Sequence, residues 1–254
     1  MKILNKKNLK KIIKNLFLKP KPELMVGRLN ERTRIRWIES TLKELPSGSK
    51  ILDAGAGEQQ FKKFCSHLEY ISQDFAQYTP EEVEVGLQMA KWDYGKLDII
   101  SDIASIPVCD ETFDSIMCTE VFEHIINPRE ALKEFSRILK KNGHLIITAP
   151  FCSLTHFAPY HFYSGFNRFF YEEELEKNGF EIIEITPNGN YFEYLAQELN
   201  RLGFVAGKHN NRLLNRKEQI TIQKVKGILQ DLSNNDTNTS ELLCFGYQVL
   251  AKKK

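Results

Sequence analysis

The sequence predicts an α/β fold built on a doubly wound, mostly parallel sheet with helices on both faces. At residues 50–68 a short apolar strand leads through two glycines into a stretch with helical spacing. Strand, glycine turn and helix in that order form the first unit of such a sheet. Three predicted strands in succession also end in an acidic residue, Asp53, Asp74 and Asp102. Because open α/β sheets bind ligands at the carboxyl ends of their strands, these acids predict a site at that edge.

Residues 1–22 are predicted to form a basic amphipathic helix in front of the main domain, residues 23–254. Apolar side chains recur at helical spacing with lysines between them, and Pro20 and Pro22 end the pattern. The apolar positions are Leu9, Ile12, Ile13, Leu16 and Phe17. Two interpretations stay open. The helix lies on an anionic membrane surface, or its apolar stripe docks on the domain or on a partner chain.

Charge and cysteine content argue against several classes of protein. Residues 1–21 hold eight lysines and no acid, which leaves 27 basic against 33 acidic residues in the rest, a net charge of −6. A body with that sign is a poor nucleic-acid binder. The five cysteines form no Cys-x-x-Cys pair, so we expect no disulfides and no metal site. No apolar run reaches the roughly 18 residues of a membrane span. We therefore expect a cytoplasmic protein, with residues 1–21 available for contact with a membrane surface.

The stretch at residues 50–57 carries the strongest local pattern. Its first three residues are typical of the end of a buried strand. Gly55 and Gly57 then let the chain turn tightly and approach a ligand without a Cβ in the way. Residues 58–68 have apolar side chains at helical spacing and predict a helix. A tight strand-to-helix turn without a ligand is the alternative interpretation.

Asp74 ends the second predicted strand, residues 69–74, and lies 19 residues after Gly55. A carboxylate about 20 residues beyond such glycines bonds ribose hydroxyls in nucleotide-binding sheets. The dinucleotide pattern would also have a third glycine at the position of Gln60. Its absence argues against a nicotinamide or flavin cofactor.

The remaining elements follow from apolar periodicity and helix-breaking residues. A helix capped by Asn30 precedes the first strand, and a second clear helix starts at Asn127–Pro128 and is ended by Gly143. The predicted strands are 97–103, a fourth from Phe113, 145–150, 180–185 and 242–250. The other predicted segments are a helix at 171–178, two helices within 191–232 and a flexible loop at 233–240.

The stretch from Phe151 to Tyr171 contains nine aromatic residues in 21 positions, together with His156 and His161. Its proline and glycine oppose one continuous helix, so we expect a loop that forms a pocket wall. A hydrophobic loop folded over the sheet is the alternative. Each histidine either contacts a substrate or is hydrogen-bonded within the packed loop.

Several of these landmarks together resemble class I S-adenosylmethionine-dependent methyltransferases. The acid and glycines at 53–57 are similar to the first motif of that family, with Gln59 where a third alternate glycine often stands. Asp102–Ile103 and Phe113–Asp114 resemble the next two landmarks, and Glu120–His124 resembles the segment after the fourth strand. The resemblance covers about residues 50–185.

The resemblance implies a seven-stranded, Rossmann-like methyltransferase fold with an antiparallel last strand and a helical insertion at about 191–240. It implies S-adenosylmethionine as cofactor. The cofactor-binding residues would be Asp53, Gly55, Gly57, Asp74, Phe75, Asp102, Ile103 and Glu120.

The same resemblance implies O- or N-methylation of a small-molecule or glycan- or lipid-linked acceptor. Because the sulfonium carries its own leaving group, such an enzyme mainly aligns nucleophile, methyl carbon and sulfur. A hydroxyl or amine acceptor also needs a base, for which His156 and His161 are the candidates. Two other functions remain open: an NAD-dependent or nucleotide-sugar oxidoreductase on a similar sheet, and a catalytically silent cofactor-binding module.

Overall fold

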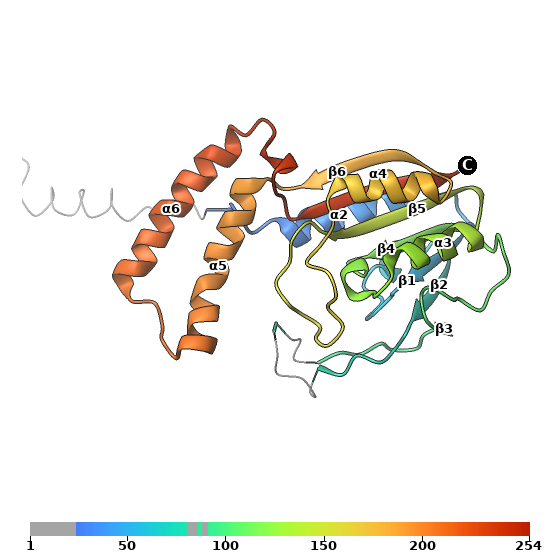
Figure 1. The fold of residues 1–254 in the computed structure, drawn as a ribbon, viewed down its shortest axis with the longest axis horizontal. Helices are drawn as coiled ribbons and strands as arrows, with labels where there is room; N and C mark the ends of the chain where they lie inside the picture. Colours follow the sequence, from blue (N-terminus) through green and yellow to red (C-terminus); the bar gives the residue numbers. More distant parts are fainter. Residues whose placement is uncertain (1–23, 81–85, 88–90) are drawn as a thin grey trace, which may run out of the picture.

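A seven-stranded sheet forms the centre of the molecule (Figure 1). The computed structural model describes residues 24–80, 86–87 and 91–254. The strands are β1 (Lys50–Ala54), β2 (Glu69–Asp74), β3 (Ile99–Ile100), β4 (Phe113–Thr119), β5 (Leu139–Pro150), β6 (Phe180–Asn188) and β7 (Gly246–Lys253), in the spatial order β3-β2-β1-β4-β5-β7-β6. The pairs from β3 across to β5 are parallel, whereas β7 runs antiparallel to both β5 and β6. The predicted fold class, with its antiparallel last strand, is confirmed.

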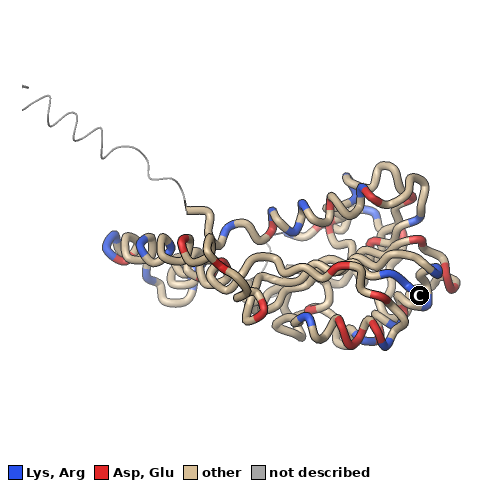
Figure 2. The backbone as a smooth tube through the Cα atoms, turned by 90° about the horizontal axis from the view of Figure 1, so that it is seen from above, with Lys and Arg blue, Asp and Glu red and all other residues tan. Residues whose placement is uncertain are grey.

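Helices cover both faces of the sheet. The helices are α2 (Asn30–Lys43), α3 (Pro128–Ile138), α4 (Arg168–Lys177), α5 (Tyr191–Asn210) and α6 (Arg216–Asn234), with short 3-10 turns η1 (Lys62–Phe64), η3 (Phe122–His124) and η4 (Thr239–Glu241). In Figure 1, α3 and α4 lie in front of the sheet and α2 lies behind it. Figure 2, seen from above, shows helices on both sides of the strands, with basic and acidic residues interspersed along the chain.

Two hydrophobic clusters fill the spaces between these layers. Alternation along β1 sends Ile51 and Leu52 into opposite clusters, both fully buried. Leu52 joins side chains of α3 and α4, such as Phe135, and Ile51 joins α2 through Ile38 and Leu42. Burying each of these aliphatic side chains stabilises the fold by about 1.5–3 kcal/mol.

Helices α5 and α6 come between β6 and β7 along the chain. They pack against each other and extend beyond the sheet (Figure 1). Asn215 and Glu218 form a capping box at the start of α6. The segment before α2 docks here: Val26 N–H donates to Gln230 Oε1 (2.9 Å), and Gly27 has φ +73°. A Cβ at Gly27 would lie 2.3 Å from the backbone nitrogen of Gln197. Only glycine therefore allows this close approach.

The segment after β1 differs from the prediction. No α-helix forms over residues 58–68, where the structure has turns and the 3-10 turn η1. Gln59 adopts φ +56°, a left-handed conformation that interrupts a right-handed helix. The apolar spacing reflects burial alone, since Phe61 and Cys65 pack beneath the turn.

The edge strand β3 is also shorter than the predicted 97–103. Asp98 turns toward the neighbouring strand and accepts hydrogen bonds from Ser72 N–H (2.9 Å) and Ser72 Oγ (2.8 Å). At the other end Asp102 accepts from Ala104 N–H and begins a turn. These polar side chains limit the strand to Ile99–Ile100.

Gly143 does not end α3, as the sequence had predicted. The helix stops at Ile138 and the chain continues directly into β5, which contains Gly143. A Cβ at this position would lie 2.8 Å from the carbonyl oxygen of Asp114, so glycine permits close contact between strands. Asn127 precedes α3 as predicted, with Pro128 in the first turn, but its side chain makes no capping hydrogen bond.

Three further boundaries are shifted. Helix α4 begins at Arg168, inside the predicted loop, because the Asn167 side chain caps it by accepting from Phe170 N–H. Residues 233–240 include the end of α6 and part of η4, and β7 begins at Gly246 rather than at residue 242. The predicted N-terminal helix, residues 1–22, lies outside the described residues. Within the described part of the chain, no helix is long and apolar enough to span a membrane.

Candidate functional site

The glycine turn lies at the carboxyl end of β1, against the neighbouring strand β2. The N–H groups of Gly55 and Ala56 both donate to the Gln73 carbonyl (2.9 Å each). Gly55 has φ +76°, and a Cβ there would lie 2.6 Å from Val121 Cγ2. Backbone angle and space therefore both require glycine at this position.

Asp74 holds the far side of the turn. It is 6% exposed, and its two carboxylate oxygens accept hydrogen bonds from Gly57 N–H (2.9 Å) and Ala76 N–H (3.0 Å). Burial raises the pKa of Asp74, and these backbone donors oppose that shift. A carboxylate has about four acceptor positions, so Asp74 keeps acceptor capacity for a ligand's hydroxyl groups.

Asp53 lies beneath the turn rather than at its surface. Its carboxylate is 1% exposed and accepts a hydrogen bond from the Tyr70 hydroxyl (2.6 Å), which joins β1 to β2. Burial raises the pKa of Asp53 to about 7, although the Tyr70 hydrogen bond favours the ionised form. In this conformation Asp53 supports the turn from below.

Phe75, Asp102 and Ile103 follow β2 and β3 at the same edge of the sheet. Gln73 Nε2 donates to the Ser101 carbonyl (2.8 Å) and ties the two strand ends together. Asp102 is exposed, whereas Ile103 is buried in the core. The Phe75 ring meets Tyr160 of the aromatic loop edge-on, with centroids 4.9 Å apart.

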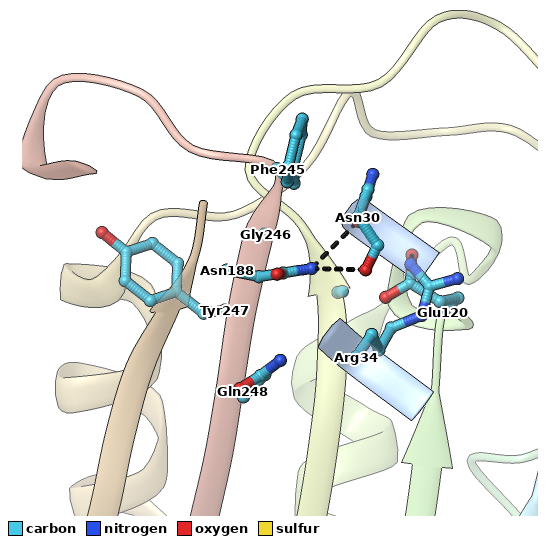
Figure 3. A pocket seen from close by; sticks show the side chains of 9 residues that line it. Asn30, Arg34, Glu120, Asn188, Phe245, Gly246, Tyr247 and Gln248 are labelled. Carbon is cyan, nitrogen blue, oxygen red and sulfur yellow. Dashed lines mark hydrogen bonds and ion pairs between the residues drawn. The ribbon is translucent and has the colours of Figure 1, made fainter. Parts of the chain in front are cut away.

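Glu120 lies in a small polar pocket at the tip of β4, under α2 (Figure 3). Its carboxylate pairs with Arg34 Nη1 (2.9 Å) and accepts from Thr148 Oγ1 (3.0 Å). Asn188 lines the same pocket and donates to Asn30. Sequence reasoning missed Arg34 and Asn188, because no local pattern joins residues so far apart in the chain.

Aromatic rings cover the glycine turn. A Cβ at Gly57 would lie 2.7 Å from Trp92 Cζ2, so the indole packs directly against this glycine. Phe157, from the aromatic loop, stacks on Tyr78 (4.4 Å between centroids) and meets Trp92 edge-on (4.8 Å). The loop thus reaches the turn through Phe157 and Trp92. Sequence reasoning had singled out neither of them as a site residue.

Three histidines gather where η3 meets the aromatic loop. The ring centroids of His124 and His156 lie 4.7 Å apart, and those of His156 and His161 4.9 Å apart. Burial and the neighbouring His156 lower the pKa of His124 to about 3, and burial also lowers the pKa values of His156 and His161. Below this cluster, Glu123 is 1% exposed, and burial raises the pKa of its carboxyl well above the usual range. The structure thus brings His156 and His161 together and adds His124, which sequence reasoning had not proposed.

Comparison with known proteins identifies the domain. A family model described as a methyltransferase domain matches residues 27–185, more than half of the chain. The chain belongs to this methyltransferase family. Together with the sheet order, the match confirms a class I S-adenosylmethionine-dependent methyltransferase, with S-adenosylmethionine as cofactor.

Individual methyltransferases share only about 30% sequence identity with parts of this chain. The chain is 30% identical over 125 residues to the mitochondrial ubiquinone biosynthesis O-methyltransferase of Schizosaccharomyces pombe, covering 47% of this chain and 45% of that protein. It is 29% identical over 142 residues to a ubiquinone/menaquinone biosynthesis C-methyltransferase of Geotalea daltonii, covering 52% and 59%. The chain thus spans about half the length of these curated relatives. The fold is shared with a candidate methyltransferase of Bacillus halodurans C-125 (TM-score 0.52, 13% identity, covering 87% of this chain and 99% of that one).

The residues at the turn fit the cofactor of this methyltransferase family. Asp74 offers unused acceptor positions at the end of β2, where ribose hydroxyls bind in such sheets. The turn at Gly55, which has φ +76°, ends β1 at the same edge of the sheet. Asp102 and Ile103 follow the end of β3, next along the same edge. S-adenosylmethionine supplies an electrophilic methyl group when bound.

Proposed function

We propose that this methyltransferase transfers a methyl group from S-adenosylmethionine to a small acceptor held by the aromatic loop, residues 151–171. The observation that carries the proposal is the packing of Phe157 against Tyr78 and Trp92, with Trp92 lying directly on Gly57. This contact joins the expected acceptor loop to the expected cofactor turn. A shared site is the arrangement that methyl transfer requires, since donor and acceptor must be aligned.

In this proposal Asp74 accepts hydrogen bonds from the ribose hydroxyls, and Asp102 with the Ile103 and Phe75 backbone borders the adenine. Gly55 and Gly57 allow the chain to wrap the methionine end, while Asp53 supports the turn from below through Tyr70. Glu120 contributes to cofactor binding from the tip of β4, where the ion pair with Arg34 fixes its carboxylate.

The acceptor we favour is a hydroxyl or amine on a ring or sugar, free or attached to a glycan or lipid carrier. Exposed aromatic side chains of the loop, Phe162 (44%) and Tyr163 (38%), suit stacking on such a group. The names of the curated relatives, which refer to ubiquinone and menaquinone biosynthesis, point to a phenolic quinone precursor. Carbon methylation, as in the second relative's name, is the alternative outcome.

A base takes the acceptor's proton, and His161 is the better placed of the two candidates. Its imidazole is half-exposed and lies 3.1 Å from Ser153 Oγ. Burial lowers its pKa, so the ring is neutral near pH 7 and able to accept a proton. His156 is the second candidate, but its Nε2 faces Glu123.

The basic segment at residues 1–21 would bring the protein to an anionic membrane surface and would take no part in methyl transfer. Its lysines could each contribute about 1 kcal/mol at an anionic surface, and less in salt. If the acceptor is attached to a lipid, contact of residues 1–21 with the membrane would bring the enzyme to its acceptor.

The proposal is tested by incubating the protein with S-adenosylmethionine that carries a labelled methyl group. Catechols, demethylated quinols and amino sugars serve as acceptors, and transfer of label is counted. Gly55→Ala should abolish transfer, because its Cβ would collide with Val121. Gly227→Ala is the matched control, since no atom of the described residues lies within 4 Å of its Cβ position in α6. Cofactor binding without transfer to any acceptor would support a silent module instead.

A further inference from the structure

Glu123, His124 and His156 bring three donor atoms together beside the aromatic loop. One ligand atom from each lies within 4.8 Å of the other two. Glu123 Oε1 is 3.7 Å from His124 Nε2 and 3.8 Å from His156 Nε2. The first two residues come from η3 at the end of β4, and the third comes from the aromatic loop.

The hydrogen bonds of the two imidazoles fix which nitrogen faces the carboxylate. His124 Nδ1 lies 2.5 Å from the Tyr160 carbonyl oxygen, and His156 Nδ1 lies 2.8 Å from the Leu154 carbonyl oxygen. A carbonyl can only accept, so Nδ1 carries the proton in both rings. In a neutral imidazole the lone pair is then on Nε2. Both Nε2 atoms, each with a lone pair, therefore lie within 4 Å of the Glu123 carboxylate.

No hydrogen bond joins these three groups. Separations of 3.7 and 3.8 Å exceed the range of about 2.7–3.2 Å for an N–H···O bond. The other carboxylate oxygen, Glu123 Oε2, is buried and has no hydrogen-bond partner among the residues that the structure describes. An ionised Glu123 carboxylate and two Nε2 lone pairs repel one another in a nearly buried place, so the cluster needs either a proton on Glu123, in line with its raised pKa, or a cation between the three atoms.

We propose that Glu123, His124 and His156 bind one divalent transition-metal ion, of which Zn²⁺ is the best match. Two imidazole nitrogens and one carboxylate form the donor set of open zinc sites and of non-haem iron(II) sites. Metal–ligand distances of about 2.0–2.2 Å put tetrahedral ligands roughly 3.3–3.5 Å apart. The two separations from Glu123 Oε1, 3.7 and 3.8 Å, need a closure of only a few tenths of an ångström. The two imidazole nitrogens lie within 4.8 Å of each other and need at most about 1.5 Å.

The surroundings support a metal in two further ways. The Tyr160 and Leu154 carbonyls orient the two rings through Nδ1, the outer-shell arrangement that metal-binding histidines commonly have. Three protein ligands also leave at least one position open, and His161 lies beside the cluster, with its ring centroid 4.9 Å from that of His156. A metal would thereby fasten the aromatic loop to the end of β4.

The open position suggests a role for the metal in catalysis, and this role rests on the proposed methyl transfer. An acceptor hydroxyl bound to the metal would have a lowered pKa, and its proton would pass to His161 or to water. His156 would then be a metal ligand and His161 the base. Metal binding itself does not depend on this role and is tested separately.

The test uses the full chain, stripped with a chelator and then titrated with Zn²⁺, Mn²⁺ and Mg²⁺ alone, by calorimetry and by competition with a chromophoric chelator. We expect one Zn²⁺ per chain, with Mn²⁺ weaker and Mg²⁺ weakest. Glu123→Gln, His124→Asn and His156→Asn should each weaken Zn²⁺ binding by at least about 10–100-fold, the cost of losing even an outer-shell partner. His144→Asn, on β5 outside the cluster, should leave it unchanged.

Two additional readouts separate a specific site from binding by cysteines or from misfolding. Zn²⁺ should raise the thermal midpoint of the unmodified protein but not that of Glu123→Gln, a substitution that keeps the size of the side chain and should fold. Co²⁺ bound at the site should show no sulfur-to-metal charge-transfer absorption. The proposal would be overturned by absence of stoichiometric metal binding, by sulfur ligation of Co²⁺, or by Zn²⁺ affinity in all three variants equal to that of the unmodified protein. S-adenosylmethionine affinity, measured without metal, reports on the cofactor site independently.

Discussion

Replacing Asp74 by Asn tests the cofactor turn with a change of almost no volume. Both carboxylate oxygens act as acceptors, from Gly57 N–H (2.9 Å) and from Ala76 N–H (3.0 Å). Either orientation of an Asn amide would therefore point its NH₂ group at a backbone N–H donor. Loss of one hydrogen bond to a charged group costs about 1.5–3 kcal/mol. In the bound state a ribose hydroxyl would also lose its charged acceptor at a similar cost, so S-adenosylmethionine affinity should drop by roughly 10–150-fold.

Titration calorimetry with S-adenosylmethionine and S-adenosylhomocysteine measures this loss. Asp98→Asn is the matched control, because Asp98 also accepts hydrogen bonds next to β2, from Ser72 N–H and Ser72 Oγ. It lies away from the turn and should change affinity less than about twofold. Equal affinity in Asp74→Asn and the unmodified protein would refute the assignment of Asp74 to the ribose.

The other predictions concern the base, the N-terminal segment and a buried carboxyl. His161→Ala should lower kcat by roughly 10²–10⁴-fold while the Kd for S-adenosylmethionine stays constant; an unchanged kcat would make His161 a packing residue. Deletion of residues 1–21 should abolish pelleting with anionic liposomes at low salt yet preserve methyl transfer to a water-soluble acceptor. If the full chain ignores such liposomes, the alternative of a docked helix is favoured. Burial raises the pKa of Asp53 to about 7 from 3.8, so the folded state holds this proton more tightly than the unfolded state does. The contribution of Asp53 to stability is therefore greatest below pH 4 and falls as the pH rises to about 7. Asp53→Asn should become more stable relative to the unmodified protein over this range in urea unfolding, and a pH-independent difference would contradict the burial argument.

Sequence patterns predicted the sheet because they depend on short-range periodicity. The apolar strands, the glycine turn and the helix start at Asn127–Pro128 are each local, and strand polarity follows from the alternation of elements. The same approach failed at residues 58–68, where buried Phe61 and Cys65 imitate a helical stripe although Gln59 has a left-handed backbone. Burial sets that spacing, and burial alone does not decide whether a helix forms.

The site was predicted only in outline, since its chemistry depends on contacts between distant segments. The spacing of Asp74 after Gly55 was informative because both follow adjacent strands. The pairing of Glu120 with Arg34 and the packing of Trp92 on Gly57 join residues 86 and 35 positions apart. Glu123 and His124 looked like an ordinary polar pair, and only folding brings His156 to them.

A crystal structure with S-adenosylhomocysteine bound tests the central claim most directly, namely that the glycine turn and the aromatic loop form one site. Both ribose hydroxyls should lie within hydrogen-bond distance of the Asp74 carboxylate. The sulfur should face the loop that carries Phe157 and His161. A ligand bound elsewhere, or a sulfur directed away from residues 151–171, would contradict it.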